Sequence, residues 1–215
     1  MNNKIKVILV DDHAVVRAGF RMLLSAEAGI EVIAEADRGE SACQLYLEQQ
    51  PDVLVLDLSM PGIGGLESIR RICNRDSSAK ILVFSVHDEM VYVDRAMAAG
   101  ARGYITKNSA PDILVSAIQH IAAGKIYIEQ GLMKNRPLLQ NSASDYQTVV
   151  DSLSAREFDV FLLLAKGLTA HKIADELCLG YKTVANYGTQ IRSKLKVSSV
   201  AELAHIAMVL GMLKN

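Results

Sequence analysis

The chain has 215 residues, of which 50% are hydrophobic and 22% charged, so it can bury a core and is not a disordered protein. Its length allows one large domain or two smaller ones. We expect neither a signal peptide nor a membrane helix, because the apolar run before Asp11 is short and none approaches about 18 residues. Three widely separated cysteines without a Cys-x-x-Cys pair argue against disulfide and zinc frameworks and favour a reducing cytoplasm.

Charge is unevenly distributed along the chain. Residues 1–125 carry 13 Lys and Arg against 16 Asp and Glu, whereas residues 148–215 carry 8 against 6. A surplus of two positive charges is a weak indication of nucleic-acid binding, but most of this charge is clustered between Lys166 and Lys196.

Residues 1–125 alternate short apolar runs with amphipathic stretches. The expected strands are Ile5–Val10, Ile30–Ala34, Val53–Leu56, Ile81–Phe84 and Gly103–Ile105, and the expected helices are Ala14–Ala26, Glu40–Gln49, Leu66–Cys73, Glu89–Ala99 and Asp112–Ala123. Apolar strands without alternation indicate burial on both faces. The pattern predicts an α/β domain with a five-stranded parallel sheet and helices on both of its faces.

The composition changes after Gly124. Residues 126–148 contain Gly131, Pro137 and a polar stretch, which predicts a linker with room for a short helix over 131–139. Residues 149–215 predict a small all-α domain, with helices over 154–166, 169–177, 181–195 and 199–213. Two of these helices begin with the spacing of a capping box, Ser154 with Glu157 and Ser199 with Glu202.

Charged and hydroxyl side chains follow four of the expected strands, at the edge where open parallel sheets bind ligands. Asp11 and Asp12 follow the first strand and Asp57 the third, and these strands are neighbours in the flavodoxin-like order. Three carboxylates repel one another unless a cation neutralises them, and oxygen ligands favour Mg²⁺. Ser85 and Lys107 would bind the other oxygens of a phosphoryl group, so that Asp57 can attack a phosphodonor.

Each of these residues has a plainer interpretation when taken alone. Asp11, Asp12 or Ser85 could cap the helix that follows it, and Lys107 could be a surface charge. The occurrence of all the required residue types at four strand ends favours the phosphoryl-transfer site.

Residues 4–124 resemble the receiver domain of response regulators, through V-I-L-V-D-D-H, L-V-L-D-L-S-M-P-G, I-L-V-F-S and G-Y-I-T-K. The resemblance implies a phosphoacceptor at Asp57, a metal site of Asp11, Asp12, Asp57 and the Ser59 carbonyl, and a phosphoryl-binding and switch set of Ser85, Tyr104 and Lys107. Val86 could narrow access for small phosphodonors. His87 could act as a polar gate, but we expect it to be exposed.

The stretch 181–195 predicts a helix with two contrasting faces. Val184, Ile191 and Leu195 form an apolar stripe, whereas Lys182, Asn186, Thr189 and Ser193 lie on the opposite, polar face. Such a face fits the major groove of DNA, and it equally fits a solvated helix.

Residues 150–212 resemble the LuxR-type helix-turn-helix, through L-S-A-R-E-F-D-V, I-A-D-E-L, K-T-V-A-N-Y and K-L. The resemblance implies that Ala185, Asn186 and Thr189 face bases, and that Lys182, Thr183 and Lys194 lie near phosphates. Gly180, where a serine cap is common, and Gly188 depart from the pattern. In the family, part of the last helix pairs two DNA-binding domains.

Together the two resemblances predict a two-component response regulator of the NarL/FixJ type. It would not be an enzyme, would accept a phosphoryl group on Asp57 from a sensor histidine kinase with Mg²⁺, and would bind duplex DNA as a homodimer when phosphorylated. One alternative is a phosphatase of the haloacid-dehalogenase type, but that class needs Asp-x-Asp after the first strand, where this chain has Asp11, Asp12 and His13. The other is an adaptor whose helical domain binds protein instead of DNA.

Overall fold

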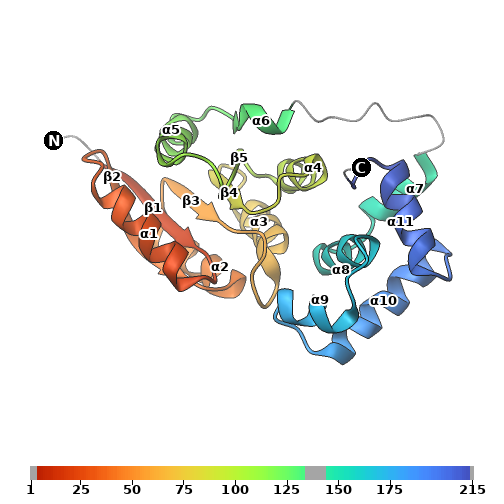
Figure 1. Ribbon diagram of the computed structural model, residues 1–215. Helices are drawn as coiled ribbons and strands as arrows, with labels where there is room; N and C mark the ends of the chain where they lie inside the picture. The colour runs from red at the N-terminus through yellow and green to blue at the C-terminus, as the bar shows by residue number, and fades with distance from the viewer. Residues whose placement is uncertain (1–3, 134–143, 214–215) are drawn as a thin grey trace. The chain divides into compact units, whose positions relative to one another are not determined.

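The computed structural model describes residues 4–133 and 144–213. The chain divides into two compact units, residues 1–134 and 135–215 (Figure 1). A parallel sheet with flanking helices forms the first unit, and the second is built of helices, so the predicted fold class is confirmed. None of the helices in the described ranges is both long enough and apolar enough to span a membrane.

The sheet of the first unit is parallel throughout and has the order β2-β1-β3-β4-β5-β6. Its strands are β1 (Ile5–Val10), β2 (Ile30–Ala36), β3 (Val53–Leu56), β4 (Ile81–Ser85), β5 (Gly103–Thr106) and β6 (Tyr127–Ile128). The strand order reverses between β1 and β3, which places their carboxyl ends side by side, where doubly wound sheets bind ligands. The sixth strand was not predicted, because two residues carry no periodic pattern.

Helices cover both faces of this sheet. They are α1 (Ala14–Ser25), α2 (Gly39–Gln49), α3 (Gly64–Arg75), α4 (Met90–Ala99), α5 (Pro111–Ala122) and the short α6 (Gln130–Met133). Leu24 of α1 and Leu114 and Ile118 of α5 share one buried core with the inner strands. The connection through α1 runs along the sheet in one direction, and those through α2, α3 and α4 run in the opposite direction. Because such crossovers are right-handed, α2, α3 and α4 lie on the face opposite to α1.

The second unit contains α7 (Ser144–Asp151), α8 (Ala155–Ala165), α9 (Ala170–Glu176), α10 (Tyr181–Leu195) and α11 (Val200–Val209). Both predicted capping boxes are present, at the starts of α8 and α11. The turn from α9 to α10 contains Cys178 in the left-handed conformation, with φ of 51°. Val184, Ile191 and Leu195 of α10 are buried, as the apolar stripe predicted.

The segment predicted as a linker over 126–148 contributes to both units. β6 and α6 follow residue 125 within the first unit, and α7 begins at Ser144 in the second. Residues 134–143, which include most of the stretch predicted to have room for a short helix, lie outside the described residues.

Candidate functional site

Two carboxylates and an ammonium group meet at the carboxyl edge of the sheet. Asp11 and Asp57, directly after β1 and β3, are 5% and 2% exposed. Lys107, directly after β5, places its Nζ 2.6 Å from Oδ2 of both aspartates. Because adjacent parallel strands end at the same edge, side chains far apart in sequence form one buried ionic cluster.

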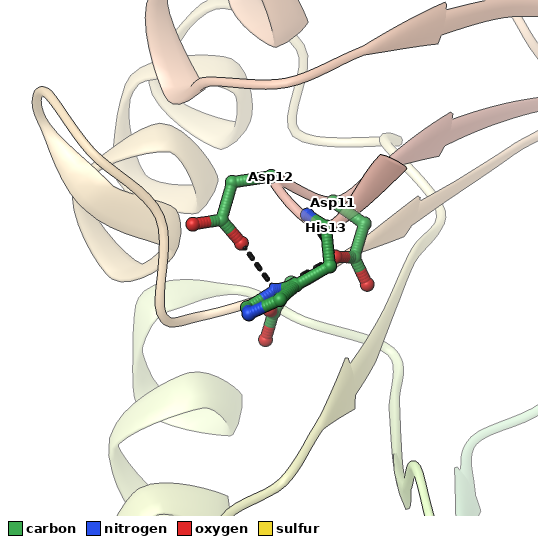
Figure 2. A group of neighbouring side chains, drawn as sticks. Asp11, Asp12 and His13 are labelled. Carbon is green, nitrogen blue, oxygen red and sulfur yellow. Dashed lines mark hydrogen bonds and ion pairs between the residues drawn. The ribbon is translucent and has the colours of Figure 1, made fainter. Parts of the chain in front are cut away.

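Asp12 and His13 lie next to Asp11 at this edge of the sheet, as Figure 2 shows. One potential ligand atom from each of Asp11, Asp12, His13 and Asp57 lies within 4.8 Å of the others. Oδ1 of Asp12 is buried and accepts no hydrogen bond among the described residues, although Nδ1 of His13 lies 2.8 Å away as an ion-pair partner (Figure 2). A buried carboxylate oxygen without a hydrogen-bond donor is the feature that a bound cation would satisfy.

His13 was not foreseen in this cluster. Its Nδ1 lies 3.4 Å from Oδ1 of Asp11 and 2.8 Å from Oδ1 of Asp12, but its side chain is 65% exposed, in contrast to the buried Asp11 and Asp57. The oxygen donors therefore define the chemistry, and an all-oxygen set fits Mg²⁺. A nitrogen ligand from His13 would instead suit a softer transition metal.

Burial governs the ionisation of the candidate phosphoacceptor. It raises the pKa of Asp57 to about 6, and the positive charge of Lys107 opposes this increase. Burial also lowers the pKa of Lys107, but the charges of Asp57 and Asp11 outweigh it and raise this pKa above its usual value. The pair is therefore held with a charged lysine beside a carboxylate that protonates more readily than usual.

Gly65 fixes the path of the chain after Asp57. Its N–H donates to the carbonyl of Leu58 at 3.0 Å, and a Cβ at this position would lie 2.2 Å from the carbonyl oxygen of Asp57. No side chain fits in that space. The glycine thus lets the start of α3 pack directly on the acceptor loop, where Ser59 N–H donates to Oδ1 of Asp57 at 3.3 Å.

The two predicted switch residues are both fully buried. Ser85 ends β4 and Tyr104 lies on β5, each 0% exposed. The Tyr104 hydroxyl donates to the carbonyl of His87 at 2.9 Å, and the His87 N–H donates to the Ser85 hydroxyl at 3.4 Å. Burial raises the pKa of Tyr104, so its hydroxyl stays protonated as a donor.

The expectation that His87 is exposed was wrong. Its side chain is 13% exposed, it hydrogen-bonds Ser59 Oγ at 2.8 Å, and it stacks on Tyr92 with ring centroids 4.0 Å apart. Tyr92 on α4 supplies a flat apolar surface that the local sequence around His87 does not reveal. Val86 is the neighbour that points to solvent, at 57% exposure.

The polar face of α10 is exposed as predicted. Lys182, Thr183, Asn186 and Thr189 are exposed and Ala185 is partly so, while Gly188 is buried on the opposite side. The hydroxyl of Thr189 donates to the carbonyl of Ala185 at 3.1 Å. No side chain caps the helix at Gly180.

Lys194 has a partner within its own unit. Its Nζ lies 2.7 Å from both carboxylate oxygens of Glu157 on α8, and Glu157 also accepts from the Ser154 N–H at 2.8 Å. The lysine is 43% exposed and joins α8 to α10. A contact between Lys194 and a DNA phosphate would therefore compete with this ion pair.

The sequence did not reveal three residues that shape the acidic site. They are Gly65, His87 through its contact with Ser59, and Arg17, which donates to the carbonyl of Asp11. Only Gly65 carried a signal, because a glycine just after a strand-end aspartate indicates close backbone approach.

The protein has two units. The first carries an acidic site at the carboxyl edge of a parallel sheet, and the second contains a helix-turn-helix. Residues 7–119 match the family model of the response regulator receiver domain, and residues 151–207 match that of the bacterial regulatory proteins of the luxR family. The chain belongs to the response regulators that join a receiver domain to a LuxR-type DNA-binding domain, a family of transcriptional regulators.

Named relatives and solved structures agree with this assignment. The transcriptional activator protein ExaE of Pseudomonas putida is 39% identical over 97% of this chain and 98% of its own length. The response regulator UvrY of Escherichia coli K12 is 39% identical over 97% and 95%.

Among solved structures, a LuxR-family two-component response regulator from Aurantimonas sp. SI85-9A1 is 41% identical, with a TM-score of 0.60, covering 61% of this chain and 94% of that one. RcsB of Salmonella enterica serovar Typhimurium, bound to a promoter with a phosphomimetic, is 26% identical, with a TM-score of 0.60, over 95% and 98%.

Proposed function

We propose that Asp57 accepts a phosphoryl group from a sensor histidine kinase, and that this event controls binding of α10 to duplex DNA. The observation that carries the proposal is the buried Asp11–Lys107–Asp57 cluster at the point where the strand order reverses. Since duplex DNA is the proposed ligand, a cytoplasmic location belongs to the same proposal. A role as a regulator, and not as an enzyme, fits the named relatives, which are transcriptional activators and response regulators.

The chain's own side chains supply most of the required chemistry. The Asp57 carboxylate is the nucleophile, and its pKa of about 6 keeps it largely ionised at neutral pH. Lys107, which contacts the Asp57 carboxylate, and the Ser85 hydroxyl at the end of β4 would bind oxygens of the transferred group. In the phosphorylated state we expect the Lys107 ammonium, which otherwise pairs with Oδ2 of Asp57, to pair with a phosphoryl oxygen.

The residues present fit a magnesium ion. Carboxylates of Asp11, Asp12 and Asp57 and the carbonyl of Ser59 would hold it, and the buried Oδ1 of Asp12, which accepts no hydrogen bond among the described residues, supports this set. When bound, Mg²⁺ supplies positive charge that offsets the negative charge of the carboxylates and the phosphoryl group.

Substitution of the acceptor tests the proposal. Asp57→Asn keeps the size of the side chain and removes the nucleophile, so phosphorylation by a cognate kinase should stop while the fold survives. Chelation of Mg²⁺ in the wild type, or the substitution Asp12→Ala, should slow phosphorylation of Asp57 by orders of magnitude. Phosphorylation of Asp57→Asn at the wild-type rate would refute the assignment.

The DNA-binding part of the proposal rests on the exposed polar face of α10. We propose that Ala185, Asn186 and Thr189 face bases and that Lys182, Thr183 and Lys194 contact phosphates. Asn186→Ala should lose about 1–3 kcal/mol of discrimination at one or two base pairs. Lys182→Ala should weaken binding to all sequences and reduce the salt slope by about one.

Lys182 is a better test of phosphate contact than Lys194, because Lys194→Ala would also break the ion pair with Glu157. If Asn186→Ala weakened binding equally to specific and to random DNA, our assignment of the α10 face that enters the groove would be wrong. Homodimer formation on phosphorylation completes the proposal, and the promoter-bound RcsB relative supports its DNA-binding part.

A further inference from the structure

A guanidinium group lies behind the turn that carries Asp11 and Asp12. Arg17 is in α1 and its side chain is 19% exposed. Its Nη1 donates to the backbone carbonyl of Asp11, and its Nε donates to Oε2 of Glu35 at 3.2 Å. One side chain thus joins the acidic turn to strand β2.

Strand β2 holds Asp11 through both of its backbone groups. The N–H of Asp11 donates directly to the carbonyl of Ala36 at 3.1 Å, and the Asp11 carbonyl is held indirectly through Arg17 by Glu35. The β1–β2 pairing shifts register between Val7 and Ile8, and beyond the shift Leu9 is paired with Glu35. The irregular pairing therefore sets which β2 residues are opposite the end of β1.

The acidic turn needs such support because its two carboxylates repel each other. The Asp11 side chain is fixed by the His13 N–H at 2.8 Å and by Lys107. Asp12 is restrained only by the exposed imidazole of His13, whose Nδ1 lies 2.8 Å from its Oδ1, and this oxygen accepts no hydrogen bond within the described part of the chain. The orientation of the Asp12 side chain consequently depends on the backbone of the turn. Residues that hydrogen-bond to metal ligands commonly influence metal affinity.

We propose that Arg17 is a positioning residue for the metal site: by holding the Asp11 carbonyl while paired with Glu35, it fixes the turn that aims Asp11 and Asp12 at one cation. This inference rests on the proposed magnesium site. It assigns to Arg17 no contact with the metal or the phosphoryl group.

Arg21 provides a matched control on the same helix. Its Nη1 lies 2.8 Å from Oε1 of Glu35, so it pairs with the same carboxylate and carries the same charge. Its side chain is 65% exposed, and among the described residues Glu35 is its only hydrogen-bond partner. The two arginines therefore differ in the contact with Asp11.

Calorimetric titration of the full-length, unphosphorylated protein with Mg²⁺ tests the proposal. Arg17→Ala should raise the dissociation constant about 10- to 100-fold, as loss of an outer-shell group does, and shift the Asp12 and His13 amide resonances of the metal-free protein. Arg17→Lys, which keeps the charge but has a single donor nitrogen, should recover part of the affinity. Arg21→Ala should bind Mg²⁺ as the wild type does.

Glu35→Gln covers the case in which Arg17→Ala does not fold. This variant keeps an acceptor for Arg17 without the ion pair, and its affinity should fall between those of Arg21→Ala and Arg17→Ala. Wild-type affinity in Arg17→Ala, or in Glu35→Gln if only that variant folds, overturns the inference. Equal losses of Mg²⁺ affinity in Arg17→Ala and Arg21→Ala also overturn it, since the loss of one positive charge would then explain both results. No Mg²⁺ binding by the wild type would instead overturn the proposed metal site itself.

Discussion

At the scale of single residues, His87 connects the acceptor loop with both switch positions. Its imidazole hydrogen-bonds Ser59, two residues after Asp57, and stacks on Tyr92 of α4. Its carbonyl accepts from the Tyr104 hydroxyl. The side chain therefore bridges the loops that follow β3 and β4, beside the carboxylate that we propose is phosphorylated.

Removal of this bridge should shorten the lifetime of the phosphoryl group. His87→Ala would open the edge of the site to water, and a neutral hydrogen bond contributes about 0.5–1.5 kcal/mol. As about 1.4 kcal/mol corresponds to tenfold in rate, we expect loss of phosphate to accelerate about two- to tenfold. Decay of the phosphorylated protein after removal of the donor measures this rate.

His120→Ala is the control for that experiment. His120 is an exposed histidine on α5 that hydrogen-bonds Ser116, and its removal should leave the decay unchanged. A lifetime for His87→Ala equal to or longer than that of the wild type would contradict the bridging role.

The site residues divide into those that sequence reveals and those that it does not. Asp11, Asp57 and Lys107 were predictable as neighbours because each directly follows a recognisable strand, and parallel strands end at one edge. The contacts of His87 depend on a stacking surface from α4, and those of Arg17 depend on a register shift in the pairing of β1 with β2. Neither of those determinants leaves a local pattern.

At the scale of elements, the buried Gly188 of α10 is a position where a substitution should increase stability. A Cβ at Gly188 would lie 3.6 Å from Leu164 Cδ1 and 3.5 Å from Arg192 Nη1, which are ordinary contact distances. Because glycine in a helix costs about 0.5–1 kcal/mol relative to alanine, Gly188→Ala should raise the free energy of unfolding by that amount. Urea denaturation of the full-length protein, followed by amide resonances of α10, measures it.

Gly167→Ala should have the opposite effect. Gly167 follows α8 with φ of +85°, a conformation that alanine adopts only with strain. Destabilisation by both substitutions would mean that α8 and α10 pack too closely at Gly188 to accept a methyl group.

The ion pair between α8 and α10 should make the second unit sensitive to acid. Burial raises the pKa of Glu157, but the hydrogen bonds from Lys194 and from Ser154 outweigh it and hold this pKa below its usual value. A carboxyl group with a lowered pKa stabilises the fold above its unfolded pKa of about 4.3, and this contribution is lost as pH falls through the folded value.

Glu157→Gln should remove that contribution. The free energies of unfolding of wild type and variant should differ at neutral pH, and the difference should shrink as pH falls below about 4.3. Unfolding at a series of pH values measures the difference, with Glu176→Gln, an exposed residue of α9, as the control. A difference that is independent of pH would show that packing, and not ionisation, underlies the effect.

Elements with a strong local signal were predicted closely, and those made by tertiary contacts were not. The helix predicted over 154–166 is α8, Ala155–Ala165, since its capping box fixes the start locally. Strand β6 exists because Tyr127 N–H donates to the Arg102 carbonyl and Glu129 N–H to that of Tyr104. A pairing that depends on β5 cannot be inferred from residues 126–129 alone.

At the scale of the whole molecule, the acidic site and α10, the helix that we propose binds DNA, belong to different compact units. Phosphorylation can affect DNA binding only if it changes the relative free energies of two states of the chain. We expect that the unphosphorylated receiver either covers part of the second unit or fails to dimerise, and that phosphorylation favours a dimer competent to bind DNA. Half-sites about one helical turn apart would match the symmetry of such a dimer.

A fragment of residues 135–215, which contains α7 to α11, separates the two mechanisms. If the receiver inhibits, the fragment should bind duplex DNA more tightly than the unphosphorylated full-length protein does. If the receiver instead supplies dimerisation, the fragment should bind no better than the unphosphorylated protein and more weakly than the phosphorylated one, because two linked half-site contacts gain from effective concentration. Titrations of one promoter fragment at constant salt compare the three forms, since the salt concentration alone changes such affinities. Identical binding by all three would refute both mechanisms and leave the acidic site without a role in DNA binding.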